Sequence, residues 1–226
     1  MKISKVLGAL AAVATFATVP VGAQAGSWAL GCTGGGGSIS RLVTDLGTVS
    51  WANRGWINSG FGHSGGNDNY YTGEYGGSFM RSFFVFDVGR LGGATTATLE
   101  LTNVCQNDAG TFVFSGINNP GSLPSWTGSF PASPYFAQAA SGGQYGTYTT
   151  TGVGGSSPNN LWSIALGGSA VADLNAAAGG NGVFGVGGAI STDVPISTVP
   201  EPASIVLVAA GLAGLASFSA RRRKQS

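Results

Sequence analysis

The chain has 226 residues, of which 43% are hydrophobic and only 8% are charged. Its formal net charge is +1, but residues 26–198 hold four arginines, eight acidic residues and no lysine, so this part is acidic by four charges. That balance disfavours binding to nucleic acid or to an anionic membrane through a basic patch. The length of this part suits one domain with its own hydrophobic core.

Residues 1–25 have the three zones of a secretory signal peptide. Two basic residues, Lys2 and Lys5, precede an apolar run at 6–21, and small residues follow at Ala23 and Ala25. We predict that signal peptidase cleaves after Ala25, using Ala23 and Ala25 as its recognition residues. The alternative is a buried N-terminal helix, which the order of the three zones disfavours.

The mature part contains two cysteines, Cys32 and Cys105. Because an exported protein meets an oxidising environment, we expect these two residues to form a disulfide. A redox or zinc site is disfavoured, since the chain has no CxxC motif and its single histidine is His63. We expect neither a metal ion nor a cofactor.

The composition of residues 26–198 is typical of a β-protein, because helix formers are few and turn formers abundant. The clearest strand is 79–88, where Met80, Phe84, Phe86 and Val88 alternate with Phe83 and Val85. We predict a central strand with one face in the core. Other strands are predicted at 38–43, 48–52, 97–101, 111–115, 145–151, 160–165 and 183–190. Around eight short strands indicate an all-β sandwich.

One short helix is predicted at 169–178, with Ser169 as its N-cap and Gly179 after its end. It should cross from one sheet to the other. The segments 53–77 and 118–143 show little alternation, and we predict that they are surface loops. Since loops of that length are uncommon in a compact domain, they either carry function or contain strands that the pattern does not reveal.

Two motifs match functional patterns without their required context. Residues 62–66, Gly-His-Ser-Gly-Gly, match GxSxG, but the only histidine lies inside the motif and both flanks are loop-like. Residues 180–185 match GxGxxG, but the predicted helix precedes the motif and the strand follows it, which reverses the order of a dinucleotide site. Both motifs favour turns.

Oxygen ligands occur at Asn67, Asp68 and Asn69, with Glu74 nearby. Such a run can hold calcium, but Asn and Asp more often form turns. A pair of glycosidase carboxylates among Asp68, Glu74, Asp87 and Asp108 also stays open. Because no carboxylate stands out as the acid or the base, we expect no enzymatic activity and assign no catalytic residue.

Seven aromatic residues lie in or beside the predicted loops: Trp51, Trp56, Tyr70, Tyr71, Tyr75, Trp126 and Tyr135. Exposed, coplanar rings would stack on sugar rings and form a polysaccharide-binding platform. The simpler interpretation is that the rings cover the ends of the core.

The C-terminal end combines three features. Pro200, Glu201 and Pro202 hold the backbone extended, and residues 203–220 contain neither charge nor proline. Eighteen helical residues span about 27 Å, close to the ~30 Å of a bilayer core. The cations that follow predict a cytoplasmic anchor and place the domain across the membrane: Arg221, Arg222, Arg223 and Lys224. A soluble core helix would show a polar side, which 203–220 lacks.

This arrangement at 199–226 resembles the PEP-CTERM sorting signal. The resemblance implies recognition by a membrane-embedded exosortase, cleavage near Pro200, and a Gram-negative source that makes exopolysaccharide. Residues 81–87 and 94–101, with 144–148, 172–177 and 186–190, resemble jelly-roll-like β-sandwich domains found before such signals. Together these resemblances imply an exported, non-enzymatic protein of the cell surface or extracellular matrix. An exopolysaccharide-binding module is the alternative.

Overall fold

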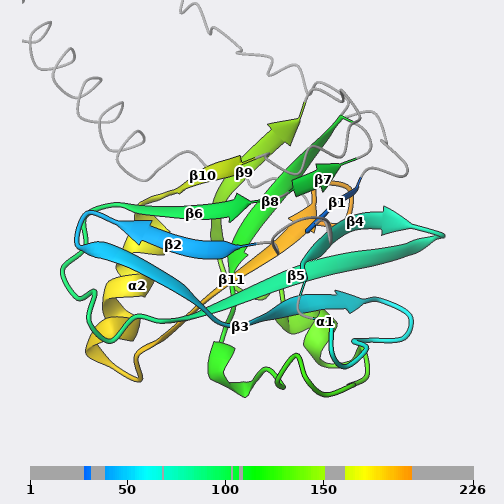
Figure 1. Cartoon of the computed structure of the whole chain (residues 1–226), viewed down its shortest axis with the longest axis horizontal. Helices are drawn as coiled ribbons and strands as arrows, with labels where there is room; N and C mark the ends of the chain where they lie inside the picture. Colours follow the sequence, from blue (N-terminus) through cyan, green and yellow to red (C-terminus); the bar gives the residue numbers. More distant parts are fainter. Residues whose placement is uncertain are drawn as a thin grey trace, which may run out of the picture.

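The computed structural model describes residues 28–31, 39–67, 69–102, 104–106, 109–150 and 161–194. These residues form eleven β-strands, two α-helices and one short 3-10 helix (Figure 1). The predicted all-β class with few helices is therefore confirmed. The strands pair in one nearly closed antiparallel sheet that folds into two layers. The jelly-roll arrangement stays a prediction.

The first layer contains β10 (Leu161–Leu166), β6 (Ala97–Thr102), β2 (Ser40–Thr44) and the first part of β3 (Gly47–Asn58), in that order. In β6, buried and half-buried residues alternate, with Ala97, Leu99 and Leu101 inside. Side chains of successive strand residues point to opposite faces, so this alternation puts one face of the layer against the core. The strand predicted at 97–101 is therefore present, one residue longer than expected.

The second layer contains the rest of β3, followed by β5 (Ser78–Asp87), β11 (Val183–Ile190), β8 (Gly110–Gly116) and β9 (Gln144–Thr150). A register shift between Trp51 and Asn53 lets β3 pair with β2 before it and with β5 after it. Such a bulge bends a strand, which allows β3 to pass between layers. The predicted strand 48–52 is too short because the bulge interrupts the alternation there.

Three further strands are absent from the predicted set: β1 (Trp28–Gly31), β4 (Tyr71–Tyr75) and β7 (Val104–Gln106). Of these, β4 lies in a segment predicted as a loop. β4 pairs with β5 through a tight turn at Gly76 and Gly77, whose φ angles are 61° and 77°. Positive φ at both central positions is the requirement of a two-residue type I′ hairpin. The prediction of a surface loop over all of 53–77 is therefore wrong at 53–58 and at 71–75.

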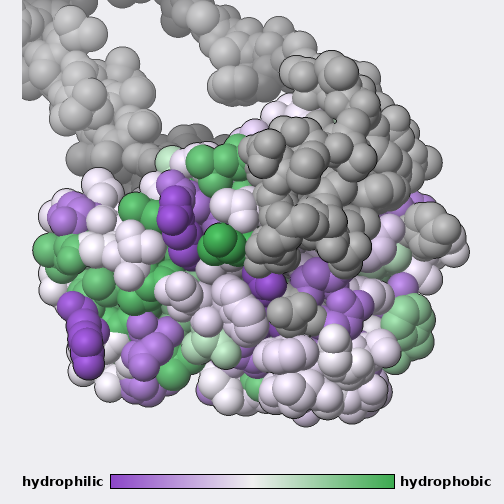
Figure 2. Space-filling model, in the orientation of Figure 1, coloured by the Kyte–Doolittle hydropathy of each residue, from purple (hydrophilic) through white to green (hydrophobic). Residues whose placement is uncertain are grey.

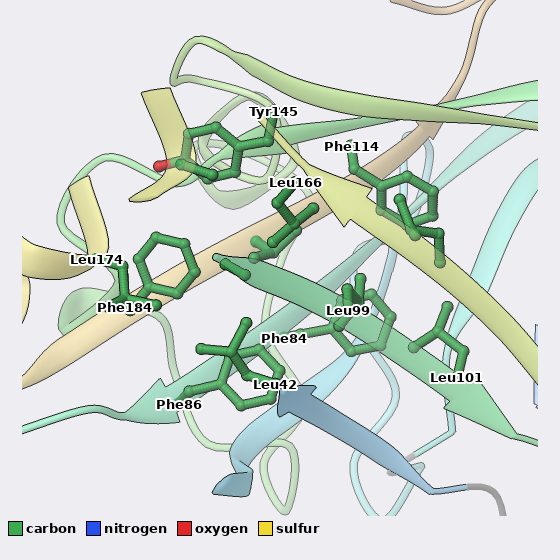
Figure 3. Close-up of a cluster of buried hydrophobic side chains, with 14 of the residues drawn as sticks. Leu42, Phe84, Phe86, Leu99, Leu101, Phe114, Tyr145, Leu166, Leu174 and Phe184 are labelled. Carbon is green, nitrogen blue, oxygen red and sulfur yellow. The ribbon is translucent and has the colours of Figure 1, made fainter. Parts of the chain in front are cut away.

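The main core lies between the two layers (Figure 3). Figure 3 shows Leu42, Leu99 and Leu101 of the first layer facing Phe84 and Phe86 of β5. Each of these five side chains is at most 2% exposed. Burial of such side chains contributes about 1.5–3 kcal/mol each, which makes this cluster a principal source of stability.

A second apolar cluster covers the outer face of the second layer. Residues 117–143, which we call the loop layer, lie over this face and include η1 (Pro120–Ser122) and α1 (Tyr135–Gln138). Leu123, Phe130 and Ala139 of the loop layer pack against the second-layer residues Ile57, Phe83 and Val85. β5 is thus buried on both faces, which corrects the expectation that only one of its faces is in the core.

Helix α2 (Gly168–Gly179) connects β10 in the first layer to β11 in the second, as predicted for the helix at 169–178. Ala170 and Leu174 point into the main core. The predicted cap is wrong: Gly167 occupies the N-cap position, and the Ser169 hydroxyl donates to the carbonyl oxygen of Gln144 at 3.3 Å. Glycine is among the residues favoured at an N-cap, and the Gly167 carbonyl oxygen accepts from the N–H groups of Ala170 and Val171.

Candidate functional site

The candidate site lies where β3 ends and the chain turns back along its edge. Asn58 and Gly62 exchange two backbone hydrogen bonds, of 2.9 and 3.0 Å. The Asn58 side-chain oxygen also accepts from the backbone N–H groups of Gly60 and Phe61. Asn commonly closes a turn in this way. This turn, at residues 59–61, ends where the GxSxG motif begins; within the motif, His63 bridges Phe130 and residues 65–66 form a second turn.

His63 connects this edge to the loop layer. Its ring is 3% exposed, with Nδ1 2.7 Å from the carbonyl oxygen of Trp56 and Nε2 3.0 Å from that of Trp126. Carbonyl oxygens only accept, so the protonated ring donates to both, whereas a neutral ring donates to one. The ring also stacks on Phe130 at 4.8 Å. Because both nitrogens face the fold, His63 is not placed to activate Ser64, which is exposed.

Aromatic rings gather around His63, but they do not form a flat platform. Trp56 meets Phe61, His63 and Tyr71 at centroid distances of 5.6–6.4 Å and interplanar angles of 72–80°. Edge-to-face contacts of this kind stabilise a packed cluster. Only Phe61 of this group is largely exposed, at 62%. The coplanar arrangement that would suit sugar stacking is absent from this group.

The remaining predicted aromatic residues have other surroundings. Tyr70 is buried and its hydroxyl donates to the carbonyl oxygen of Thr102, and burial raises the pKa of the Tyr70 phenol. Trp51 and Trp126 meet edge-on at 6.3 Å, and Tyr135 meets Phe130 edge-on at 5.2 Å. The side chain of Tyr75 lies outside the described residues. These contacts favour the interpretation that the rings cover the core.

Within the described part of the chain, five carboxylates accept hydrogen bonds from groups of the fold. Asp45 accepts from Thr95 and Thr96, and Asp87 accepts from Gly89. Glu100 accepts from Arg41, Asp173 from Tyr145, and Asp193 from Arg81. No group of three His, Cys, Asp or Glu residues that could hold a metal ion occurs among the residues that the structure describes. Of the four carboxylates suggested for a glycosidase pair, Asp68 and Asp108 lie outside the described residues.

A polar hollow of about 220 Å³ lies beside α2, and the sequence gives no sign of it. Its lining includes Asn118, Asn119, Tyr145, Asp173 and Gly185, from four separate segments. The Tyr145 hydroxyl points towards α2 (Figure 3) and donates to Asp173 at 2.7 Å. Burial, together with this hydrogen bond, raises the pKa of the Tyr145 phenol. Both groups are thereby engaged in holding α2 to β9.

The surface over the candidate site is uncharged and moderately polar. Figure 2 shows mostly pale, moderately polar residues at the lower right, where β3 and the following loop lie. Residues 55–62 and 64–67, like the whole of 109–172, contain no Asp, Glu, Lys, Arg or His. The described site thus consists of packed aromatics beneath an uncharged polar surface.

Most predicted terminal features lie outside the described residues. These are the signal peptide with Ala23 and Ala25, Cys32, the motif Pro200 to Pro202, the apolar helix 203–220 and the cations at 221–224. The side chain of Cys105 also lies outside, so the disulfide stays a prediction. Among the described helices, none has the length and apolar character needed to cross a bilayer.

Comparison with known proteins identifies one segment. Residues 198–224 match the family model of the PEP-CTERM protein-sorting motif, which confirms the resemblance stated for the C-terminal end. The motif implies an exported protein with a membrane-anchored precursor, sorted by exosortase-type machinery. No curated protein and no solved structure matches the chain.

Proposed function

We propose that this protein is a non-enzymatic component of the bacterial cell surface or extracellular matrix, delivered there by its PEP-CTERM motif. The motif at residues 198–224 is the observation that carries the proposal. The N-terminal segment is the export signal, cut after Ala25 by signal peptidase. The apolar segment 203–220 spans the membrane in the precursor, and Arg221 to Lys224 hold its end in the cytoplasm.

The geometry of the domain supports a structural role. An enzyme needs an acid, base or nucleophile free to meet a substrate. Here His63 is enclosed by two carbonyl oxygens, and five described carboxylates hold turns, strands or α2 in place. Buried rings that meet edge-on, under an uncharged surface, are features of a domain built to persist outside the cell.

Intact mass of the native protein tests the delivery pathway. The protein is recovered separately from membranes and from the culture medium, without reduction. We expect a released form that begins at Gly26 and ends near Pro200. A protein that keeps 221–226 and occurs only in membranes would show that the terminal helix is a lasting anchor, and cleavage near Pro200 would then be wrong. Substituting alanine at Pro200, Glu201 and Pro202 should abolish the released form.

The alternative function is binding of exopolysaccharide, which one observation favours. The Phe61 ring is 62% exposed at the border of the Trp56 cluster, where a sugar ring could lie against it. If this ring binds sugar, Phe61→Ser should reduce co-sedimentation with the purified exopolysaccharide of the producing organism severalfold. Leu46→Ser is the matched control, because Leu46 is 51% exposed in a turn between β2 and β3. Equal binding by both variants and the parent would reject this alternative.

A further inference from the structure

The last described turn of the chain is fastened to the central strand β5. The Arg81 guanidinium donates from Nε to Asp193 Oδ2 at 2.7 Å and from Nη2 to Asp193 Oδ1 at 3.1 Å. This two-point contact is the strongest geometry available to an Arg–carboxylate pair. The side chains are only 13% and 9% exposed, so water screens the pair less than it screens a surface ion pair.

The same guanidinium also holds α1. Its Nη1 donates to the carbonyl oxygen of Phe136 at 3.0 Å, and its central carbon lies 4.2 Å from the centre of the Phe136 ring. A cation at this distance is attracted to the face of an aromatic ring. We call Arg81, Asp193 and Phe136 the clasp. It joins β5, the loop layer and the end of the domain, although Arg81 and Asp193 are 112 residues apart in sequence.

The turn that the clasp holds contributes no side chain to either apolar cluster of the described residues. β11 ends at Ile190, whose carbonyl oxygen accepts from the N–H groups of Asp193 and Val194. Ile190 itself is 1% exposed and pairs with Phe112 of β8. The N–H group of Ser191 donates to the carbonyl oxygen of Thr111 at 2.9 Å, so without the clasp Ser191 would be the next firmly held residue before the sorting motif.

The position of the clasp decides how far the sorting motif reaches. Pro200 follows Asp193 by seven positions, which span at most about 25 Å, and follows Ser191 by nine positions, which span at most about 32 Å. Opening the clasp thus lengthens the tether between domain and motif by about 7 Å. In a membrane-anchored precursor, this difference is comparable to the thickness of a headgroup layer.

We infer that the clasp fixes the point where the sorting tail leaves the domain, and that it thereby limits access of the sorting peptidase to Pro200–Pro202. The inference rests on the proposed sorting function. A short tether holds the loop layer close to the membrane surface, where the folded domain obstructs an enzyme embedded in the bilayer. A linker too short for its span lowers the effective concentration of the group it carries, and a few added residues restore it.

The test measures conversion of the full-length precursor to the released form by pulse-chase in the producing organism. Asp193→Ala should accelerate conversion severalfold. Glu100→Gln is the matched control, because it breaks the Arg41–Glu100 ion pair on the first layer, far along the chain from the sorting motif. Four Gly/Ser residues inserted between Val194 and Pro195 should accelerate conversion with the clasp intact. In that longer background, Asp193→Ala should have no further effect.

Each other outcome counts against the inference. If the insertion accelerates conversion but Asp193→Ala behaves like Glu100→Gln, the clasp does not set the distance that the sorting motif can extend from the domain. If neither change alters the rate of precursor conversion, this distance is not limiting and the inference is wrong. If the parent precursor is never converted, and alanine at Pro200–Pro202 changes nothing, the proposed sorting function itself fails. Thermal melting of each variant identifies any loss of folding before the rates are compared.

Discussion

At the scale of single residues, Asp45 shows how one exposed carboxylate organises a turn. It accepts from the backbone N–H groups of Thr95 and Thr96 and from the Thr95 hydroxyl, at 2.7–3.1 Å. The side-chain hydrogen bond from Thr95, reinforced by the backbone donors, lowers the pKa of Asp45 to about 2. The β2–β3 turn is thereby joined to the segment that leads into β6.

This pKa gives a prediction for acid stability. Because the folded pKa lies below the ordinary value of 3.8, the carboxylate stabilises the fold above pH 4 and ceases to do so as the pH falls towards 2. Asp45→Asn should lower the melting temperature at pH 6, and its difference from the parent should shrink between pH 4 and pH 2. Melting followed by circular dichroism measures both. Asp87→Asn is the control, since the one hydrogen bond described for Asp87 is 3.3 Å long; parallel curves for parent and Asp45→Asn would contradict the assignment.

Glycines at two positions of β11 determine how closely the loop layer approaches. A side-chain carbon at Gly187 would lie 1.6 Å from the carbonyl oxygen of Ala139, and one at Gly185 would lie 2.5 Å from Pro120. The loop layer can therefore rest directly on the backbone of β11. The sequence shows glycines in a predicted strand, but their partners are 48 and 65 positions away, so the pattern alone could not predict this contact.

At the scale of elements, β5 is the clearest success of the sequence pattern and also shows its limit. The pattern separates Phe84 and Phe86 from Phe83 and Val85 correctly, because alternation follows from strand geometry. It gives no information about what covers the second face. That cover comes from residues 117–143, whose Gly, Pro and Ser content is typical of loops and hides four buried anchors, Ile117, Leu123, Phe130 and Ala139.

The burial of β5 on both faces gives a prediction that distinguishes it from a strand with only one face in the core. Phe83→Ala and Phe84→Ala should each destabilise the protein by about 3–5 kcal/mol, because both rings are 0% exposed. A strand with one face in the core would give a large loss for Phe84 alone. Urea unfolding measures the two free energies. Phe61→Ala, at a ring 62% exposed, is the control and should change stability little; a small loss for Phe83→Ala would show that the loop layer contributes little.

Strand boundaries are predictable where alternation is unbroken, as in β6 and β10. They are also predictable in β8 and β11, which are buried along almost their whole length. They fail at β3, because the bulge between Trp51 and Asn53 disrupts the alternation. β4 is missed for another reason: Gly73 interrupts a five-residue strand. The adjacent Gly76-Gly77 pair, flanked by Tyr75 and Ser78, is nevertheless a hairpin signal that could have revealed it.

At the scale of the whole molecule, the C-terminal sorting motif at 198–224 is predicted best, because sorting machinery recognises local sequence. The candidate site is the part of the molecule that the sequence predicts least well. The two oxygens that face the His63 ring belong to Trp56 and Trp126, 7 and 63 positions away. The clasp joins residues 112 positions apart. Neither arrangement has a local signature, because each depends on how β3, β5 and the loop layer meet.

The predicted disulfide is also a property of the whole chain. A Cys32–Cys105 bond would close a long loop and stabilise the fold by about 4 kcal/mol in the chain-entropy model. We expect reduction, and equally Cys32→Ser, to lower the melting temperature of the mature protein. Intact mass should rise by two hydrogens on reduction. Two reactive thiols in the untreated protein, with a melting temperature that does not respond to reductant, would rule out the bond.

The long uncharged stretch 109–172 has one further consequence. Dissolved salt weakens interactions between exposed charges, with a screening length of about 8 Å at physiological ionic strength. The loop layer lies entirely within this stretch, so it has no charges whose contacts salt could screen. Apart from the contact of the Arg81 guanidinium with Phe136, contacts made through this layer would keep their strength in fresh water and in brine alike.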